Sequence, residues 1–294
     1  MQQQDLTIQE ERFEIPSRDG YPLRGDVRYP ISAVPGERPA IVVSHGFKGF
    51  KDWGCFPTIG RELAEAGYVA VSFNTSGSGI GADLLNFTDV ERFEHATISG
   101  DLDDLSRILD AIVEGTLPGP RARPSAIGLL GHSRGGGVSL LRAAEDARVG
   151  AVAVWGSVSS FGRWHPGTIA EWRVRGYVPV ENTRTKQVFH LRTDILDDLT
   201  AHAQGRLNVE QAARALADRR VPVLVVHGDA DEGVAISEGR AIAGWTKGEL
   251  VELAGAGHTF GAAHPFRGRT PDLDRALAVT RDFFGRHLPA TSAP

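Results

Sequence analysis

The sequence has little of what marks secreted, membrane-spanning or nucleic-acid-binding proteins. Its 294 residues include one cysteine, Cys55, so no internal disulfide can form, and a lone thiol suits a reducing cytosol. No stretch approaches the roughly 18 apolar residues of a membrane span. The formal net charge is −5, whereas neutralising phosphates needs a basic face. We therefore expect a cytoplasmic protein that binds neither nucleic acid nor a membrane.

The first residues, MQQQDLTIQEERFEI, are polar, with neither a basic start nor an apolar centre. This pattern is unlike a signal peptide, and we expect none.

Several cofactor motifs are also missing. The glycines at 77, 79 and 81 have the wrong spacing for dinucleotide binding, and the run 46–49 lacks the Gly-Lys-Ser/Thr ending of a phosphate loop. There is no His-Glu-x-x-His and no pair of cysteines to hold zinc. We therefore expect neither a metal nor an organic cofactor.

What the sequence does have is an alternation of short apolar runs and longer amphipathic segments. The apolar runs are nearly continuous and rich in β-branched residues, which is typical of buried parallel strands. They are Ala40–Ser44, Val69–Phe73, Ala126–Leu130, Val149–Trp155 and Val221–His227, with a sixth candidate at Leu250–Leu253. Residues near Phe13–Ile15 and Leu23–Tyr29 resemble a leading antiparallel hairpin.

Helical patterns separate these strands. They cover Thr58–Ala66, Leu102–Val113, Arg134–Ala144, Asn208–Ala217 with Asn208 as N-cap, and Asp272–His287. Strand–helix alternation of this length predicts an α/β fold with a mostly parallel sheet and helices on both faces.

One long segment, from about Ser157 to Gly205, breaks this alternation. It shows no clear strand–helix unit, apart from a possible hairpin of Tyr177–Val180 against Gln187–His190. An insertion of this length within a domain is usually functional and often a lid. The alternative is an insertion that packs on the core and has only a structural function. We predict a core formed by residues 1–156 and 206–294 and a lid or cap formed by residues 157–205.

The pentapeptide Gly131-His132-Ser133-Arg134-Gly135 stands between an apolar run and a helical pattern. In that context Gly-x-Ser-x-Gly places a serine on a sharp strand-to-helix turn, with its hydroxyl exposed at the carboxyl edge of the sheet. Ser133 is therefore the candidate nucleophile.

A second loop, His45-Gly46-Phe47-Lys48-Gly49, follows the Ala40–Ser44 run. Acyl transfer needs two N–H donors for the tetrahedral oxyanion. We expect them to be the backbone amides of Phe47 and of Arg134, the residue after the nucleophile.

Two further loops follow the last two strand candidates and supply an acid and a base. His227-Gly228-Asp229-Ala230-Asp231 offers two carboxylates, of which Asp231 is preferred and Asp229 is the alternative. Gly255-Ala256-Gly257-His258 offers the histidine. Ser133, Asp231 and His258 follow one another in the chain order expected of α/β-hydrolases. The histidines at 45, 132, 227 and 264 are interpreted as structural.

With these motifs, the chain resembles the α/β-hydrolase superfamily from about residue 10 to residue 288. The runs His-Gly-Phe-Lys-Gly, Gly-His-Ser-Arg-Gly-Gly-Gly, His-Gly-Asp-Ala-Asp-Glu-Gly-Val and Gly-Ala-Gly-His are most similar to the dienelactone-hydrolase and prolyl-oligopeptidase-like esterases, which include cinnamoyl and feruloyl esterases. The resemblance favours Asp231 over Asp229, because the acid of that group stands three residues before a valine, here Val234. It also favours Phe47 and Arg134 as oxyanion donors.

The chain departs from that group in two respects. Dienelactone hydrolases proper use a cysteine nucleophile where this chain has Ser133, and prolyl oligopeptidases carry a propeller domain that is absent here.

The expected activity is therefore that of a serine esterase, acting through an acyl-enzyme on small-to-medium carboxylic esters, aromatic esters included. The expected oligomeric state is a monomer or a homodimer. Phe47, Trp164 and Trp172 are the predicted substrate contacts, and Phe50 and Trp53 are further candidates. A peptidase or amidase, or a non-catalytic binding protein of the same fold, remain the alternatives.

Overall fold

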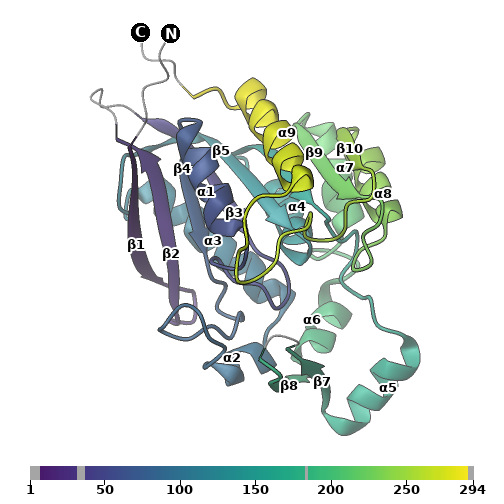
Figure 1. Ribbon diagram of the computed structural model, residues 1–294. Coiled ribbons are helices and arrows are strands. Elements are labelled where there is room, and N and C mark those ends of the chain that lie inside the picture. Colours follow the sequence, from purple (N-terminus) through teal and green to yellow (C-terminus); the bar gives the residue numbers. More distant parts are fainter. Residues whose placement is uncertain (1–6, 32–36, 183–184, 291–294) are drawn as a thin grey trace.

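A computed structural model describes residues 7–31, 37–182 and 185–290. Its centre is a twisted eight-stranded sheet (Figure 1). In order across the sheet the strands are β1 (Ile8–Pro16), β2 (Pro22–Pro30), β4 (Val69–Phe73), β3 (Arg38–Ser44), β5 (Ala122–His132), β6 (Val149–Trp155), β9 (Val223–Gly228) and β10 (Glu249–Leu253). β1, β2 and β4 pair antiparallel, and every pair from β4 to β10 is parallel. The leading hairpin and all six predicted strands are confirmed.

The central strands are apolar throughout because both faces of the sheet are covered. In β3, Ala40 and Val42 join the core on one face, while Ile41 and Val43 join the core on the other. Successive side chains of a strand point to opposite faces, so a strand between two cores needs apolar residues at every position. This explains the continuous runs in the sequence.

Helices form a layer on each side of this sheet. The core on one face includes side chains of α3 (Ile98–Glu114), α4 (Arg134–Glu145), α7 (Val209–Asp218) and α8 (Ile236–Thr246), and the core on the other includes side chains of α1 (Phe56–Glu65) and α9 (Pro271–His287). The Asn208 side chain accepts a hydrogen bond from the Gln211 amide, so the predicted N-cap of α7 is confirmed. This arrangement fixes the carboxyl ends of the parallel strands at one edge of the sheet.

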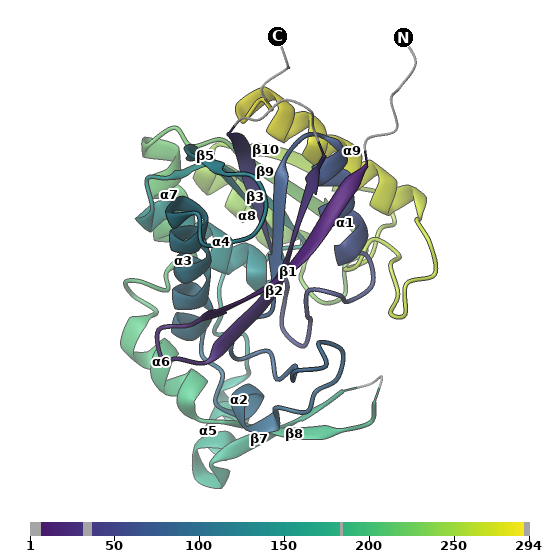
Figure 2. The ribbon, with the colours of Figure 1, turned by 90° about the vertical axis from the view of Figure 1, so that its left-hand side faces the viewer.

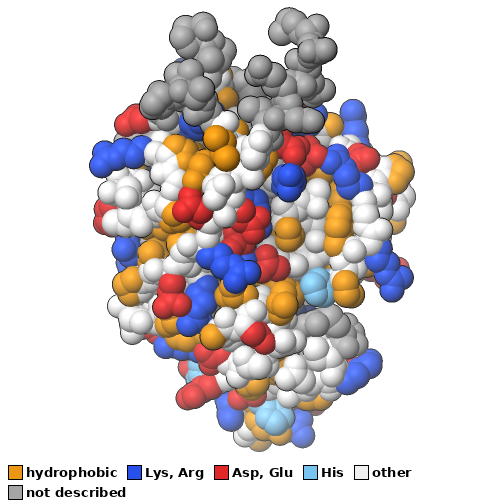
Figure 3. Space-filling model, turned by 60° about the vertical axis from the view of Figure 1, so that its left-hand side comes forward, with side chains coloured by type: hydrophobic (Ala, Val, Ile, Leu, Met, Phe, Trp, Pro, Cys, Tyr) orange, Lys and Arg blue, Asp and Glu red, His pale blue; other side chains and the backbone are white. Residues whose placement is uncertain are grey.

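The β1–β2 edge of the sheet is held by paired charges. Glu14 stands opposite Arg24 and Glu10 opposite Arg28, with N···O distances of 2.7 and 2.8 Å. Such directly opposed pairs stabilise an antiparallel ladder. On the face shown in Figure 3, basic and acidic side chains are interspersed rather than gathered by sign.

The segment between β6 and α7 contains more regular structure than its sequence indicates. It forms α5 (Pro166–Arg175), the hairpin of β7 (Tyr177–Glu181) and β8 (Val188–Arg192), and α6 (Asp194–His202). The hairpin was predicted, but the two helices were not. This segment and α2 (Val90–Glu94) lie beyond one end of the sheet (Figures 1 and 2).

Within the part of the chain that the structure describes, no helix is both long enough and apolar enough to cross a membrane.

Candidate active site

Four loops that follow strands of the sheet carry the residues singled out in the sequence. They begin after β3, β5, β9 and β10, whose carboxyl ends all lie at one edge because the strands are parallel. Open α/β sheets bind their ligands at this edge.

Ser133 occupies a strained turn between β5 and α4. Its φ of 57° and ψ of −121° lie where residues with side chains rarely fall, and its N–H donates to the Trp155 carbonyl at 2.9 Å. The turn is tight enough that a Cβ on Gly135 would lie 2.4 Å from the His45 carbonyl oxygen. Strain of this kind costs on the order of 1–3 kcal/mol and is found mainly at functional sites.

The loop after β3 lies directly against Ser133. A Cβ on Gly46 would come within 2.9 Å of the Ser133 Cβ. Phe47 follows Gly46, and Arg134 is the first residue of α4, so its N–H has no acceptor within the helix. The two predicted oxyanion donors therefore belong to two segments that pack against each other at the serine, the loop after β3 and the start of α4.

The Arg134 side chain joins these two segments as well. Its guanidinium lies 5.0 Å from the centre of the Phe47 ring, and Nη2 is 2.9 Å from Asp101 Oδ2 of α3. Both side chains of this ion pair are nearly buried. Arg134 thus also contacts the loop after β3 through its side chain.

His258 and Asp231 are joined by a hydrogen bond of 2.8 Å between Nδ1 and Oδ2. The other carboxylate oxygen of Asp231 accepts from the Gly233 and Val234 amides, both at 2.8 Å. Asp229 instead accepts from the Gly255 amide at 2.6 Å. Of the two acids left open by the sequence, Asp231 is the one that contacts His258.

The surroundings of Asp231 keep it ionised. Burial acts to raise the pKa of this carboxyl, but hydrogen bonds with His227, His258 and the Val234 amide outweigh it and hold the pKa well below its usual value. His227 is fully buried, and its Nε2 also contacts the Val234 carbonyl at 2.9 Å. A charged carboxylate therefore stands behind the histidine.

The remaining histidines singled out in the sequence make structural contacts. His45 Nε2 accepts from the Thr75 amide at 3.3 Å, and His264 Nδ1 accepts from the Gly54 amide at 3.0 Å. His132 Nε2 lies 2.9 Å from the His258 carbonyl oxygen, with the two rings 4.6 Å apart. Burial, together with the nearby His258, lowers the pKa of His132 to about 4, so this ring is neutral near pH 7 and donates to that carbonyl.

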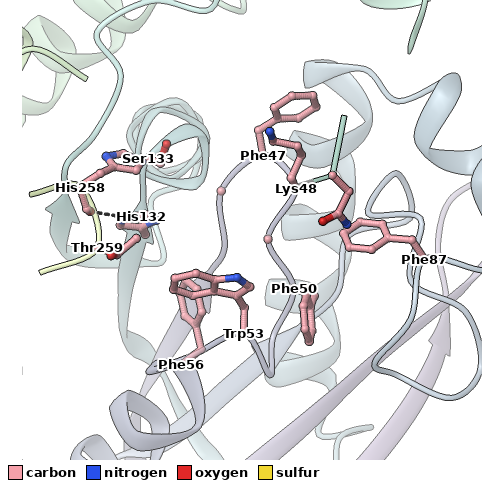
Figure 4. A pocket seen from close by; sticks show the side chains of 13 residues that line it. Phe47, Lys48, Phe50, Trp53, Phe56, Phe87, His132, Ser133, His258 and Thr259 are labelled. Atoms are coloured by element: carbon pink, nitrogen blue, oxygen red, sulfur yellow. Dashed lines mark hydrogen bonds between the residues drawn. The ribbon is translucent and has the colours of Figure 1, made fainter. Parts of the chain in front are cut away.

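Ser133 and His258 line one side of a cavity of about 410 Å³. Both side chains belong to the lining of this cavity, and no hydrogen bond joins them within the described residues. Opposite them lie Phe47, Lys48 and Phe87 (Figure 4). The remaining lining side chains are Phe50, Trp53, Phe56, His132, Asn182 and Thr259.

A second cavity, of about 230 Å³, also reaches Ser133. Phe47 lines both cavities and Trp164 lines the second. Trp172 is buried behind Trp164, with their rings edge to face at 5.0 Å, and it lines neither cavity. The structure therefore places two of the three predicted substrate contacts at a cavity wall.

Several residues of the site do not stand out in the sequence. Asp101 lies within an ordinary amphipathic helix, and Phe87 lies in a loop far from any motif. Val158 and Phe161 line the second cavity from the loop after β6. That loop follows a predicted strand as the other site loops do, and this position is the signal that could have identified it. Among the described residues, no three His, Cys, Asp or Glu side chains gather to hold a metal ion.

The sequence matches the alpha/beta hydrolase family over residues 41–268, which is more than half of the chain. A curated relative, 2,6-dihydropseudooxynicotine hydrolase from Paenarthrobacter nicotinovorans, is 26% identical over 217 residues. That match covers 73% of this chain but 49% of the relative, so the chain spans about half of the relative's length.

Two solved structures are similar over nearly the whole chain. The alpha/beta hydrolase GrgF from Penicillium sp. sh18 has a TM-score of 0.72 at 20% identity and covers 95% of this chain and 99% of its own. Est1E from Butyrivibrio proteoclasticus has a TM-score of 0.66 at 19% identity, with coverage of 94% and 98%. At these identities the likeness concerns the fold.

Proposed function

The chain belongs to the alpha/beta hydrolase family, and on that premise we propose that it is a serine-dependent hydrolase of carboxylic esters. Membership confirms the predicted fold and supports a hydrolase activity. The serine mechanism and the ester substrate are the finer parts of the proposal.

The observation that carries the proposal is the strained Ser133 beside a histidine whose Nδ1 is bonded to a buried carboxylate. In the proposed reaction, His258 Nε2 takes the Ser133 proton while Oγ attacks the ester carbonyl carbon. The negative charge that forms on the carbonyl oxygen is held by the Phe47 and Arg134 amides. His258 then gives the proton to the departing alcohol, and water releases the acid from the acyl-enzyme.

Asp231 has two functions in this scheme. Its bond to Nδ1 fixes the His258 tautomer that leaves Nε2 free to take the serine proton, and its charge stabilises the imidazolium that forms during proton transfer. The contacts that keep the pKa of Asp231 low support both functions, because a protonated acid could perform neither.

A panel of 4-nitrophenyl and alkyl esters tests the proposal directly. We expect hydrolysis by the unmodified protein and a loss of kcat by about 10⁴-fold or more in Ser133→Ala. Ser237→Ala is the matched control: Ser237 stands in the similar run Ala235-Ile236-Ser237-Glu238-Gly239, but on the exposed side of α8. Near-full activity of Ser133→Ala would contradict the proposal.

The curated relative favours one further compound for the panel. By its name it acts on 2,6-dihydropseudooxynicotine, and its matched region covers most of this chain. Turnover of that compound with no turnover of any ester would replace the proposed ester substrate while leaving the serine mechanism to be tested by the same variants.

A further inference from the structure

Ser133 stands between two separate cavities that differ in chemistry. Ser133 and Phe47 line both of them. The larger cavity mixes aromatic side chains with Lys48, His132, Asn182 and Thr259. The smaller one has walls of buried aliphatic and aromatic side chains: Ile98, Val158, Phe161, Ile195 and Val234, with the half-buried Trp164.

The smaller cavity contains two arginines, but neither offers an unpaired charge. Arg134 is paired with Asp101 at 2.9 Å. Arg163 is paired with Glu238 at 2.6 Å, and its other terminal nitrogen donates to the Gly233 carbonyl at 2.9 Å. Neither carboxylate lines the cavity. Apart from the hydroxyls of Ser133 and Ser160, a group bound there meets apolar walls and already neutralised cations, which favours an uncharged, apolar ligand.

His258 indicates which half of an ester enters which cavity. As general acid it must come within hydrogen-bond reach of the departing alcohol oxygen. His258 and its neighbour Thr259 line the larger cavity and not the smaller one. With the carbonyl carbon at Ser133, the alcohol group then points into the larger cavity, and the acyl group points into the smaller one.

We propose that the cavity formed by Ile98, Val158, Phe161, Trp164, Ile195 and Val234 is the acyl site, and that it selects uncharged acyl groups of about the size of one aromatic ring with a short tether. This assignment rests on the proposed ester hydrolysis. A dry cavity of about 150 Å³ is enough to hold benzene, and this one measures about 230 Å³. The more polar cavity of about 410 Å³ takes the larger, polar alcohol.

The segment 157–205 supplies two of the residues that line the proposed acyl site, Trp164 and Ile195. Trp164 precedes α5, and Ile195 belongs to α6, which packs against α3 beside Ile98. The segment therefore contributes walls on the acyl side as well as Asn182 on the alcohol side.

The test is a two-way ester panel with a matched pair of variants. One series varies the acyl group with a constant alcohol, and the other varies the alcohol with a constant acyl group. Phe161→Ala enlarges the acyl site and Phe87→Ala enlarges the alcohol site, with the same loss of side chain on opposite sides of Ser133. We expect Phe161→Ala to shift kcat/KM toward bulkier acyl groups by about tenfold or more while leaving the ranking of alcohols unchanged, and Phe87→Ala to do the reverse.

Two controls keep the assignment open to refutation if an alanine variant fails to fold. Phe161→Leu and Phe87→Leu enlarge the same two sites by less, so they should shift the same substrate rankings in the same direction but by smaller factors. On the unmodified protein, an acyl chain that ends in a carboxylate should react about tenfold or more slowly than its neutral isostere. Equal rates for this pair would contradict the uncharged acyl site.

The outcomes separate this assignment from the proposed function. If Phe161→Ala changes the alcohol ranking and Phe87→Ala the acyl ranking, the assignment is reversed while ester hydrolysis stands. If neither variant changes either ranking, the two cavities do not hold the ester and the assignment is wrong. If the unmodified protein hydrolyses no ester, the proposed function itself fails.

Discussion

At the scale of single residues, the difference between Asp229 and Asp231 lies in what each carboxylate contacts. The two acids stand two positions apart in one loop, so the sequence pattern alone leaves both open. Asp231 contacts His258, His227 and two backbone amides, whereas Asp229 is exposed and accepts from the Gly255 amide. Their functions should differ accordingly.

Asp231→Asn and Asp229→Asn form a matched pair that tests this difference. An amide at 231 cannot stabilise the imidazolium and holds the wrong tautomer, so kcat should fall by about 10³–10⁴-fold. An amide at 229 can still accept from the Gly255 N–H, and kcat should change by less than about threefold. Steady-state kinetics on one activated ester measure both. If kcat fell further in Asp229→Asn than in Asp231→Asn, the acid that assists His258 would be Asp229 and our assignment would be wrong.

The Arg134–Asp101 ion pair leads to a prediction about stability. In Arg134→Met the guanidinium is lost, and Asp101 is left as a buried, unpaired carboxylate, one oxygen of which already lacks a hydrogen-bond partner among the described residues. The free energy of unfolding should fall by about 3–5 kcal/mol. Urea denaturation measures it, and adding Asp101→Asn should recover part of the loss. Strictly additive effects of the two substitutions would show that the pair is not coupled.

The sequence locates the loops of the candidate triad better than it locates the residues that surround them. Ser133, Asp231 and His258 each follow a recognisable strand, so the pattern of strands alone places their loops at one edge of the sheet. Asp101 and Phe87 reach the site only through the packing of a helix and a distant loop, and no local pattern encodes that.

At the scale of helices and strands, predictability follows the amount of buried surface. The predicted strand Val69–Phe73 matches β4 at both ends, because every residue in it is buried. Helix α5 buries only Trp172 and leaves Val174 92% exposed, so its sequence lacks the stripe of apolar residues that marks a helix. The same weak pattern explains why α5 was not predicted.

The β7–β8 hairpin packs against an aromatic cluster of the core through Phe189, which is almost fully buried. The Phe189 ring lies 4.8 Å from the Phe93 ring and 5.4 Å from the Phe87 ring, whereas Val188, next to it in β8, is 54% exposed. Phe189→Ala should lower the free energy that holds the hairpin in place by about 3 kcal/mol, because the packing of the ring is lost. Limited proteolysis within residues 177–192 should then become about tenfold faster or more. Val188→Ala is the control and should change the rate by less than about twofold. Equal rates for the two variants would show that Phe189 does not hold the hairpin.

At the scale of the whole molecule, the folded state keeps several ionisable groups away from water. Asp104 of α3 is one of them. It accepts two hydrogen bonds of 2.7 Å from Ser76, one from the amide and one from the hydroxyl. Burial raises the pKa of Asp104 to about 7 against the opposing effect of those bonds, and the neighbouring Asp101 raises it further.

This shift gives a pH dependence of stability with a definite sign. Between the usual value of 3.8 and about 7, the folded protein keeps a proton on Asp104 that the unfolded chain has lost. The contribution of Asp104 to stability is therefore greatest at low pH and is lost as the pH rises toward 7. From pH 5 to pH 8, the free energy of unfolding of the unmodified protein should fall by about 2–3 kcal/mol relative to that of Asp104→Asn.

Denaturant unfolding of both proteins at several pH values measures this difference. The buried His45 and His132 titrate in both proteins, so their effects cancel in the comparison. A difference that stays constant from pH 5 to pH 8 would show that Asp104 is ionised in the folded state.

The measurement that tests the central claim most directly is covalent labelling by a fluorophosphonate, followed by mass spectrometry of the peptides. We predict one label per chain, on the peptide that contains Ser133, and no label in Ser133→Ala. His258→Ala should react at least about 100-fold more slowly, because the serine then lacks its base. A label on any other residue, or an undiminished rate in His258→Ala, would contradict the assignment of Ser133 as a nucleophile activated by His258.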